Sequence, residues 1–391
     1  MEPMDQFDMS PEALEASIAE MDQTNIDEFS SGMDYDRFIV LDKKELNQFC
    51  ALVEPLTKSS IDEYGKSVLI RSVSDTVVEL SYMNTPYNVR MNVSNKSNKQ
   101  IKTFAMTVAN LKKITTNAYA SIVFVEQSNE ISLALCESLL YLETKPLKAE
   151  QYNLERKETS NIIDKEIAQY TFKRIGSILA CTDRASEKVI VIKDKLAHFN
   201  TGAFTAKSKS PFSGDEKFLL FKQVSDIVGL LSEYTKVFLR YSVVDNLVVI
   251  NCDDNIYCEM PTSTGDKVNE FLSPAAENLL NFKADISVMN DSFLRLLSIV
   301  KSLEYLSEIV TVSFTDDKMK LVIASTDHSK QSVYEFDILE GKPQIKGDMK
   351  ITVDIFITFL KIVGDNVKYA FTENGLGIKN DFGDFLIRKS A

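Results

Sequence analysis

The sequence predicts an α+β protein of three repeated domains, each with two helices and an antiparallel sheet. One passage occurs three times: an amphipathic helix, a polar break, a strand, a turn and a second strand. An asparagine stands at the turn of each copy, as Asn129, Asn246 and Asn374, at nearly equal intervals. Asparagine suits such turns because it tolerates a positive φ. A passage repeated at near-constant spacing indicates a duplicated domain.

A first helix is expected near the start of each domain. In the earliest, Leu46, Phe49 and Val53 recur at helical spacing and form one apolar face. The second helix of each domain belongs to the repeated passage itself. The three first helices are predicted at 43–58, 165–182 and 290–306, and the three second helices at 107–118, 221–236 and 352–364.

Short alternating runs between the two helices of each domain predict strands, since alternation of apolar and polar residues marks a half-buried strand. Examples are "SVLIRSV", "KVIVIKD" and "KMKLVIAS". An antiparallel sheet with two helices on one face is a stable two-layer arrangement. The domains are predicted at 37–150, 151–280 and 281–391.

The first 36 residues have a different composition. They contain eleven acidic residues and no Lys or Arg, within a chain whose net charge is −13. The rest of the protein is therefore nearly neutral. A polar segment of one charge sign with few aliphatic residues cannot form a core, so a disordered tail is predicted.

The sequence predicts neither an enzyme nor a cofactor. The five cysteines are scattered, without a CxxC pair, and two histidines leave little for a zinc cluster or for base catalysis. No phosphate-binding glycine loop or other catalytic motif occurs. No apolar run approaches the length of a membrane span. A cytoplasmic protein without membrane partners is expected.

Three consecutive copies of this two-helix, antiparallel-sheet unit resemble a DNA polymerase sliding clamp of the bacterial beta type. The resemblance covers the chain after the acidic tail. It implies a homodimer whose six domains close head to tail into a ring around double-stranded DNA. Implied partners are a DNA polymerase, which the clamp tethers as a processivity factor, and a clamp loader. The added tail and a divergent C-terminus predict a bacteriophage version.

A clamp also predicts positively charged helices, because they face the phosphates of the encircled DNA. The six predicted helices contain thirteen basic and eight acidic residues. Each lysine could equally be part of a solvated helix surface. The predicted DNA-binding residues are Lys43, Lys44, Lys112, Lys113, Lys165, Lys173, Arg174, Lys222, Lys236, Arg295, Lys301 and Lys361.

The resemblance further implies an apolar docking groove between the second and third domains. The sequence departs here from the family, because the usual Met-Pro-Met-Arg-Leu-like ending is replaced by "IRKSA". The last apolar residues could instead complete a core strand. The predicted groove residues are Phe204, Thr205, Tyr241, Val243, Phe385, Leu386 and Ile387.

A separate prediction concerns the Ser-, Gly- and Pro-containing segment 200–217, which is expected to be a flexible loop.

A second function remains open from the sequence. The same repeats could form a monomeric docking scaffold or a transcription coactivator that does not encircle DNA. The two functions differ in whether the sheet edges of the first and third domains pair between chains.

Overall fold

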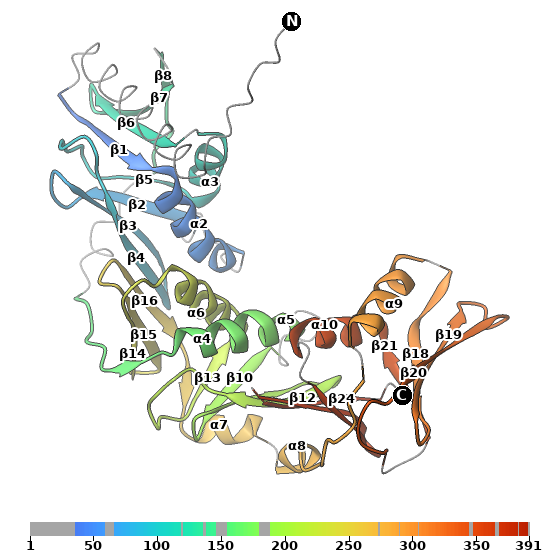
Figure 1. Ribbon diagram of the computed structural model, residues 1–391. Coiled ribbons are helices and arrows are strands. Elements are labelled where there is room, and N and C mark those ends of the chain that lie inside the picture. Colours follow the sequence, from blue (N-terminus) through green and yellow to red (C-terminus); the bar gives the residue numbers. More distant parts are fainter. Residues whose placement is uncertain are drawn as a thin grey trace, which may run out of the picture. The chain divides into compact units, whose positions relative to one another are not determined.

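The computed structural model describes residues 36–58, 66–118, 120–135, 138–145, 155–179, 188–272, 274–288, 290–303, 305–343, 347–363, 367–381 and 383–389 (Figure 1). Two compact units make up the chain. The first runs to Arg156 and includes Asp254–Cys258, and the second comprises Lys157–Asp253 and Glu259–Ala391. The predicted domain boundary at 280 falls inside the second unit, so the three-domain division stays a prediction. The acidic tail lies outside the described residues, apart from Asp36.

The first unit contains one repeat in the predicted order. Its elements are β1 (Phe38–Asp42), α2 (Lys43–Thr57), β2 (Ser67–Ser72), β3 (Val77–Asn84), β4 (Tyr87–Ser94), β5 (Phe104–Thr107), α3 (Val108–Asn117), β6 (Ser121–Gln127), β7 (Glu130–Leu135) and β8 (Ser138–Tyr141). The strands β1, β6, β7 and β8 form one antiparallel sheet, and β5, β2, β3 and β4 follow one another in a second.

Both helices of the first unit start directly after a strand, at a side-chain cap. Asp42 accepts a hydrogen bond from the backbone N–H of Lys44, and Thr107 accepts one from that of Asn110. Such caps satisfy backbone donors that a helix leaves free at its first turn. They explain why α2 and α3 begin within one residue of the predicted starts.

The second unit begins with a repeat of the same order. Its elements are β9 (Asn161–Ile162), α4 (Lys165–Ala168), the π-helical turn η3 (Gln169–Ile175), α5 (Gly176–Leu179), β10 (Val189–Lys193), β11 (Leu196–Asn200), β12 (Phe204–Lys209), β13 (Phe218–Phe221), α6 (Lys222–Tyr234), β14 (Leu239–Val244) and β15 (Leu247–Cys252). The strand that follows, β16 (Ile256–Pro261), begins in residues of the first unit and ends in residues of the second. The single helix predicted at 165–182 is thus interrupted by a π-helical turn, and residues beyond Leu179 lie outside the described part.

A connecting segment and a further repeat complete the second unit. The connection holds β17 (Ser263–Thr264), α7 (Asp266–Phe271) and α8 (Pro274–Leu279), none of which the sequence predicted. The repeat holds α9 (Asn290–Ser302), β18 (Leu306–Phe314), β19 (Lys318–Ser325), β20 (Gln331–Asp337), β21 (Asp348–Thr352), α10 (Val353–Val363), β22 (Lys368–Phe371), β23 (Gly375–Asn380) and β24 (Gly383–Arg388).

The helices of the second unit lie on two sides of its sheets. Figure 1 shows α4, α5, α6, α10 and α9 in a row along one side, with α7 and α8 on the other side of the sheet that contains β10, β12 and β24. Contacts of α6 with η3, and of α10 with both α5 and α9, hold this row together. Two faces are therefore available for function: a helical face and a face crossed by α7 and α8.

One sheet continues from the second repeat into the third. Its strand order is β17-β13-β10-β11-β12-β24-β23-β22, with β12 antiparallel to β24. Phe204 of β12 stands opposite Ile387 of β24. The Phe204 and Phe385 rings lie 5.6 and 6.1 Å from the ring of Phe359 in α10, and all three side chains are fully buried. Strand pairing and aromatic packing thus join these two repeats.

The segment 200–217, predicted as a flexible loop, contains a regular strand in its middle. Its residues Phe204–Lys209 form β12, which pairs with β11 on one side and β24 on the other. The Ser and Gly residues of this segment favoured a loop. Phe204–Lys209 nevertheless form a strand, because they pair with a strand on each side, and this pairing outweighs local propensity.

Two of the three predicted asparagine turns have the expected backbone. Asn129 and Asn246 have φ values of 64° and 58°. Their hairpins can therefore turn in two residues. No positive φ occurs at the third turn among described residues 371–375, where the Thr372 hydroxyl accepts a hydrogen bond from the N–H of Gly375 instead.

In the part of the chain that the structure describes, no helix combines the length and apolar character that a membrane crossing requires.

We predict that Phe359→Ala destabilises the second unit by about 3–5 kcal/mol, because it empties the space between two buried rings. The midpoint of urea unfolding, followed by circular dichroism since the chain has no Trp, measures this effect. Tyr305→Ala is the matched control, because 62% of Tyr305 is exposed. A loss below about 1 kcal/mol at Phe359 would show that this junction is not a main stabilising contact.

Candidate functional site

The predicted DNA-binding lysines of the first unit lie on two adjacent antiparallel helices. Lys43 is half-buried, and its Nζ donates to the carbonyl oxygen of Ala118 at 2.6 Å, just past the end of α3. Lys112 of α3 forms an ion pair with Glu54 of α2 at 2.6 Å. Lys44 and Lys113 are exposed and form no ion pair with described residues. Two of the four cations are therefore engaged within the protein.

The predicted cations of the second unit show the same division. Lys222 pairs with Asp226 one turn along α6 at 2.6 Å, and Lys301 of α9 pairs with Asp354 of α10 at 2.7 Å. The side chains of Lys173 and Arg174 in η3 lie outside the described part. The remaining predicted cations, which are exposed on or beside the helical face, are Lys165, Lys236, Arg295 and Lys361.

The internal ion pairs reduce the charge that the helices offer to a ligand. A carboxylate within 3 Å of an ammonium group largely cancels its field at longer range. These exposed pairs contribute little to stability. They leave a helical face that carries a few separated positive charges. That these residues contact DNA stays a prediction.

The predicted groove residues divide into two groups. Phe204, Thr205, Phe385, Leu386 and Ile387 come together in the paired strands β12 and β24, where each is at most 3% exposed. They form the interior of the junction between repeats.

The other two predicted groove residues lie on β14. Tyr241 is fully buried, accepts a hydrogen bond from the N–H of Gly214, and donates one to Glu216. Val243 is half-buried on the same strand. A role of either residue in partner binding stays a prediction.

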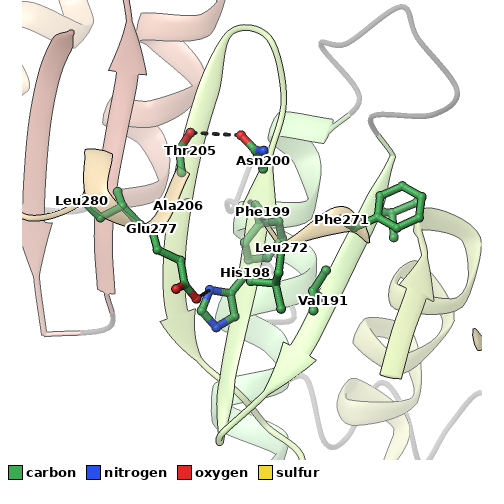
Figure 2. Close-up of a pocket in the computed structure, with 11 residues that line it drawn as sticks. Val191, His198, Phe199, Asn200, Thr205, Ala206, Phe271, Leu272, Glu277 and Leu280 are labelled. Carbon is green, nitrogen blue, oxygen red and sulfur yellow. Dashed lines mark hydrogen bonds and ion pairs between the residues drawn. The ribbon is translucent and has the colours of Figure 1, made fainter. Parts of the chain in front are cut away.

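An open pocket lies on the face of the second unit that α7 and α8 cross (Figure 2). Strands β10, β11 and β12 form one wall, and the segment from Phe271 to Leu280 forms the other. The cavity volume is about 30 Å³, so the pocket is shallow. Its apolar lining could receive part of one side chain of a docked peptide. The lining residues are Val189, Val191, His198, Phe199, Asn200, Thr205, Ala206, Phe271, Leu272, Glu277 and Leu280.

A histidine and a glutamate face each other across this pocket. Figure 2 shows the imidazole of His198 on β11 and the carboxylate of Glu277 on α8 pointing toward one another, with Nδ1 and Oε1 4.0 Å apart. Burial lowers the pKa of His198, and Glu277 opposes that shift while Lys193 and Lys207 add to it. The net effect favours the neutral form of the imidazole.

The last strand supplies a polar border to the pocket. The guanidinium of Arg388 on β24 donates from Nη2 to Asn200 Oδ1 and to Thr205 Oγ1, both at 2.8 Å. Thr205 in turn donates to Asn200 at 3.2 Å. A pocket with an apolar base and fixed hydrogen-bonding groups at one edge can bind an apolar side chain and orient the peptide carrying it.

Most residues of this pocket were absent from the sequence-based set, which included only Thr205. The segment "FLSPAAENLL" (271–280) offered one signal, since apolar residues flank a Ser-Pro helix start. That segment lines a pocket only because it crosses β10–β12, and sequence periodicity cannot predict such a crossing.

Solved structures of sliding clamps share this fold. The DNA polymerase III subunit beta of Borrelia burgdorferi, solved in complex with a natural product, superposes with a TM-score of 0.72 at 14% identity, covering 91% of this chain and 98% of that one. The DNA polymerase sliding clamp of Caulobacter crescentus superposes with a TM-score of 0.69 at 10% identity, and the match covers 91% of this chain and 100% of that one. The sliding clamp of Pseudomonas aeruginosa superposes with a TM-score of 0.70 at 10% identity, and the match covers 90% of this chain and 99% of that one.

No protein-family model and no curated protein sequence matches the chain. The superpositions on solved structures show that the chain has the fold of the bacterial DNA polymerase beta clamp over about nine-tenths of its length, as the resemblance of its repeats implies. At these identities the likeness establishes the fold.

We predict that His198 makes the second unit less stable at acidic pH. Its pKa is lower in the folded than in the unfolded chain, so below about pH 6.5 the unfolded chain binds the proton more readily. Stability is therefore lost as pH falls through the unfolded-state pKa of about 6.5. His198→Gln should flatten that part of the profile of melting temperature against pH. The only other histidine, His328, is exposed in the turn before β20, and His328→Gln should leave the profile unchanged. Equal effects of the two variants would contradict this prediction.

Proposed function

We propose that the chain is a DNA sliding clamp: a non-enzymatic processivity factor that closes as a homodimer around duplex DNA and tethers a polymerase. The clamp fold supports this proposal. The observation that carries it is the pairing of β12 with β24, because this contact provides a template for closing a ring.

In the described part of the chain, two strands that correspond to β12 and β24 have a neighbour on one side only. β12 is the third strand after the first helix of its repeat, and β24 is the last strand of the next repeat. The equivalent strands, β20 in the third repeat and β8 in the first, each lie at the edge of a four-stranded sheet. Joining β20 of one chain to β8 of another would make an eight-stranded sheet, like the one that contains β12 and β24. Repeating this contact by a two-fold rotation closes the dimer.

The side chains on these edges suit an interface. Leu140 and Tyr141 of β8 are 52% and 59% exposed, and Val333 and Tyr334 of β20 are 54% and 40% exposed. Exposed apolar edge strands are costly for a monomer, because they invite pairing with other chains. A dimer contact would cover both.

The helical faces would line the channel. Their internal ion pairs and few free cations favour weak attraction to phosphates, which salt would reduce further. A clamp that moves along DNA needs such weak contacts, since tight contacts would hold it in place. The encircling ring, and not the strength of binding, would keep the protein on DNA.

The pocket beside α7 and α8 would dock the polymerase and the clamp loader. An extended peptide could place an apolar side chain against Phe271, which lines the pocket and is 40% exposed, and reach the hydrogen-bonding groups near Arg388. Tethering of this kind raises the local concentration of the polymerase at the primer end, so dissociation no longer ends synthesis.

A charged group on the edge strand favours a second candidate, a monomeric docking scaffold. Glu335 of β20 lies between Lys318 and Lys320 of β19, 2.8 Å from each ammonium group. These bonds lower the pKa of Glu335 to about 2. Charges on an edge strand are one way in which monomers prevent strand pairing.

The mass of the full chain in solution, measured by light scattering at low micromolar concentration, separates the two candidates. A clamp gives the mass of two chains, and Val333→Lys or Leu140→Lys shifts it toward one chain by placing a charge in the interface. Each substitution is at an exposed position, so circular dichroism should show an unchanged fold.

Val73→Lys is the matched control, since Val73 is 56% exposed in the bend between β2 and β3 and belongs to neither edge strand. A single-chain mass at all concentrations would overturn the ring and favour the scaffold. A dimer that neither edge substitution weakens would overturn the proposed pairing of β8 with β20.

A further inference from the structure

The helices α2 and α3 expose cations that no described residue neutralises. The acids of the same helices are already engaged: Glu54 pairs with Lys112, and Glu45 accepts a hydrogen bond from the N–H of Ser94 at 3.0 Å. Lys44 and Lys113 stay exposed without an ion pair among described residues. We call the exposed surface of α2 and α3 around Lys44 and Lys113 the basic face.

The chain carries its own complementary segment. Residues 1–36 contain eleven acidic residues and no basic one, while the remaining residues of the chain sum to nearly zero charge. The most concentrated negative charge of the sequence therefore belongs to the chain's first segment. Opposite charges at contact distance attract one another even at the high dielectric of water or of a protein surface.

The connection places the acidic segment close to the basic face. It ends at Asp36, and β1 (Phe38–Asp42) leads directly into α2 at Lys43. The five residues of β1 therefore separate the end of the acidic segment from the start of α2 by roughly 17 Å. A segment of 35 residues can reach up to about 115 Å when extended. The acids can thus reach Lys44 and Lys113 of the same chain, and the tether makes their local concentration high.

We propose that residues 1–35 dock on the basic face and compete with duplex DNA for it. The competition rests on the proposed clamp function, whereas the docking does not. A phosphate backbone and a run of carboxylates bind the same ammonium groups, so occupation by one excludes the other. The tail would thereby weaken adventitious attraction to DNA and leave encirclement as the means of retention.

The first test measures docking without DNA. The full-length chain is compared with a full-length variant in which the ten acids of residues 1–35 are replaced by Asn or Gln. An amine-reactive ester labels exposed lysines, and peptide mass spectrometry gives the labelling rate of each.

We expect Lys44 and Lys113 to be labelled several-fold faster in the neutral-tail variant at low salt, with the difference lost above about 0.3 M salt, where the Debye length is short. Lys350, exposed on β21, is the control and should not change. Equal rates at Lys44 and Lys113 in the two proteins would overturn docking.

The second test measures competition. Binding to a short DNA duplex is followed by fluorescence anisotropy for the full chain, the neutral-tail variant, the Lys44→Gln/Lys113→Gln variant, and the combination. Neutralising the tail should strengthen binding about tenfold at 50 mM salt, since Lys44 and Lys113 become available to contact phosphates. That gain should vanish when Lys44 and Lys113 are absent, because the two changes act on one contact.

An equal gain with and without the two lysines would overturn competition at the basic face, since it would reflect only repulsion between the tail and DNA. The outcomes also separate this inference from the proposed function. Docking with no retention on circular DNA would refute the clamp alone. Retention with unchanged lysine labelling would refute the docking alone.

Discussion

The antiparallel pairing of β12 with β24 is the contact on which the rest of the second unit depends. It extends one sheet from the second repeat into the third and places Phe204 and Phe385 against Phe359. It also brings Arg388, at the end of the last strand, to Asn200 and Thr205 at the pocket. One junction therefore supports the core, the position of the helical face and the border of the pocket.

The two faces of the second unit are suited to different tasks. The helical side offers separated cations, several of them neutralised by nearby carboxylates, which favours weak contacts with a charged polymer. The opposite side offers a concave apolar surface with fixed hydrogen-bonding groups, which favours a specific contact with a protein segment. This separation would let a partner stay bound while DNA slides past the helices.

The sequence predicted the six helices because each buries one apolar face at helical spacing, as Leu46, Phe49 and Val53 do in α2. It could not predict that Lys112 meets Glu54, since that ion pair depends on how two helices pack. The strand β12 was mistaken for a loop because its second neighbour, β24, comes from the other end of the chain. The pocket was missed because α7 and α8 line it only after crossing a sheet.

The claim that the chain encircles DNA is tested most directly by topology. The full chain is incubated with a linear plasmid, whose free ends let a closed ring thread onto the DNA without a loader, and the ends are then ligated into a circle. The sample is transferred to about 0.5 M salt, where phosphate contacts are weak, and separated by gel filtration. The account predicts that protein elutes with the circle and is released when one restriction cut makes the DNA linear. Loss from the circle and the linear DNA alike, for a chain that is dimeric in solution, would contradict it.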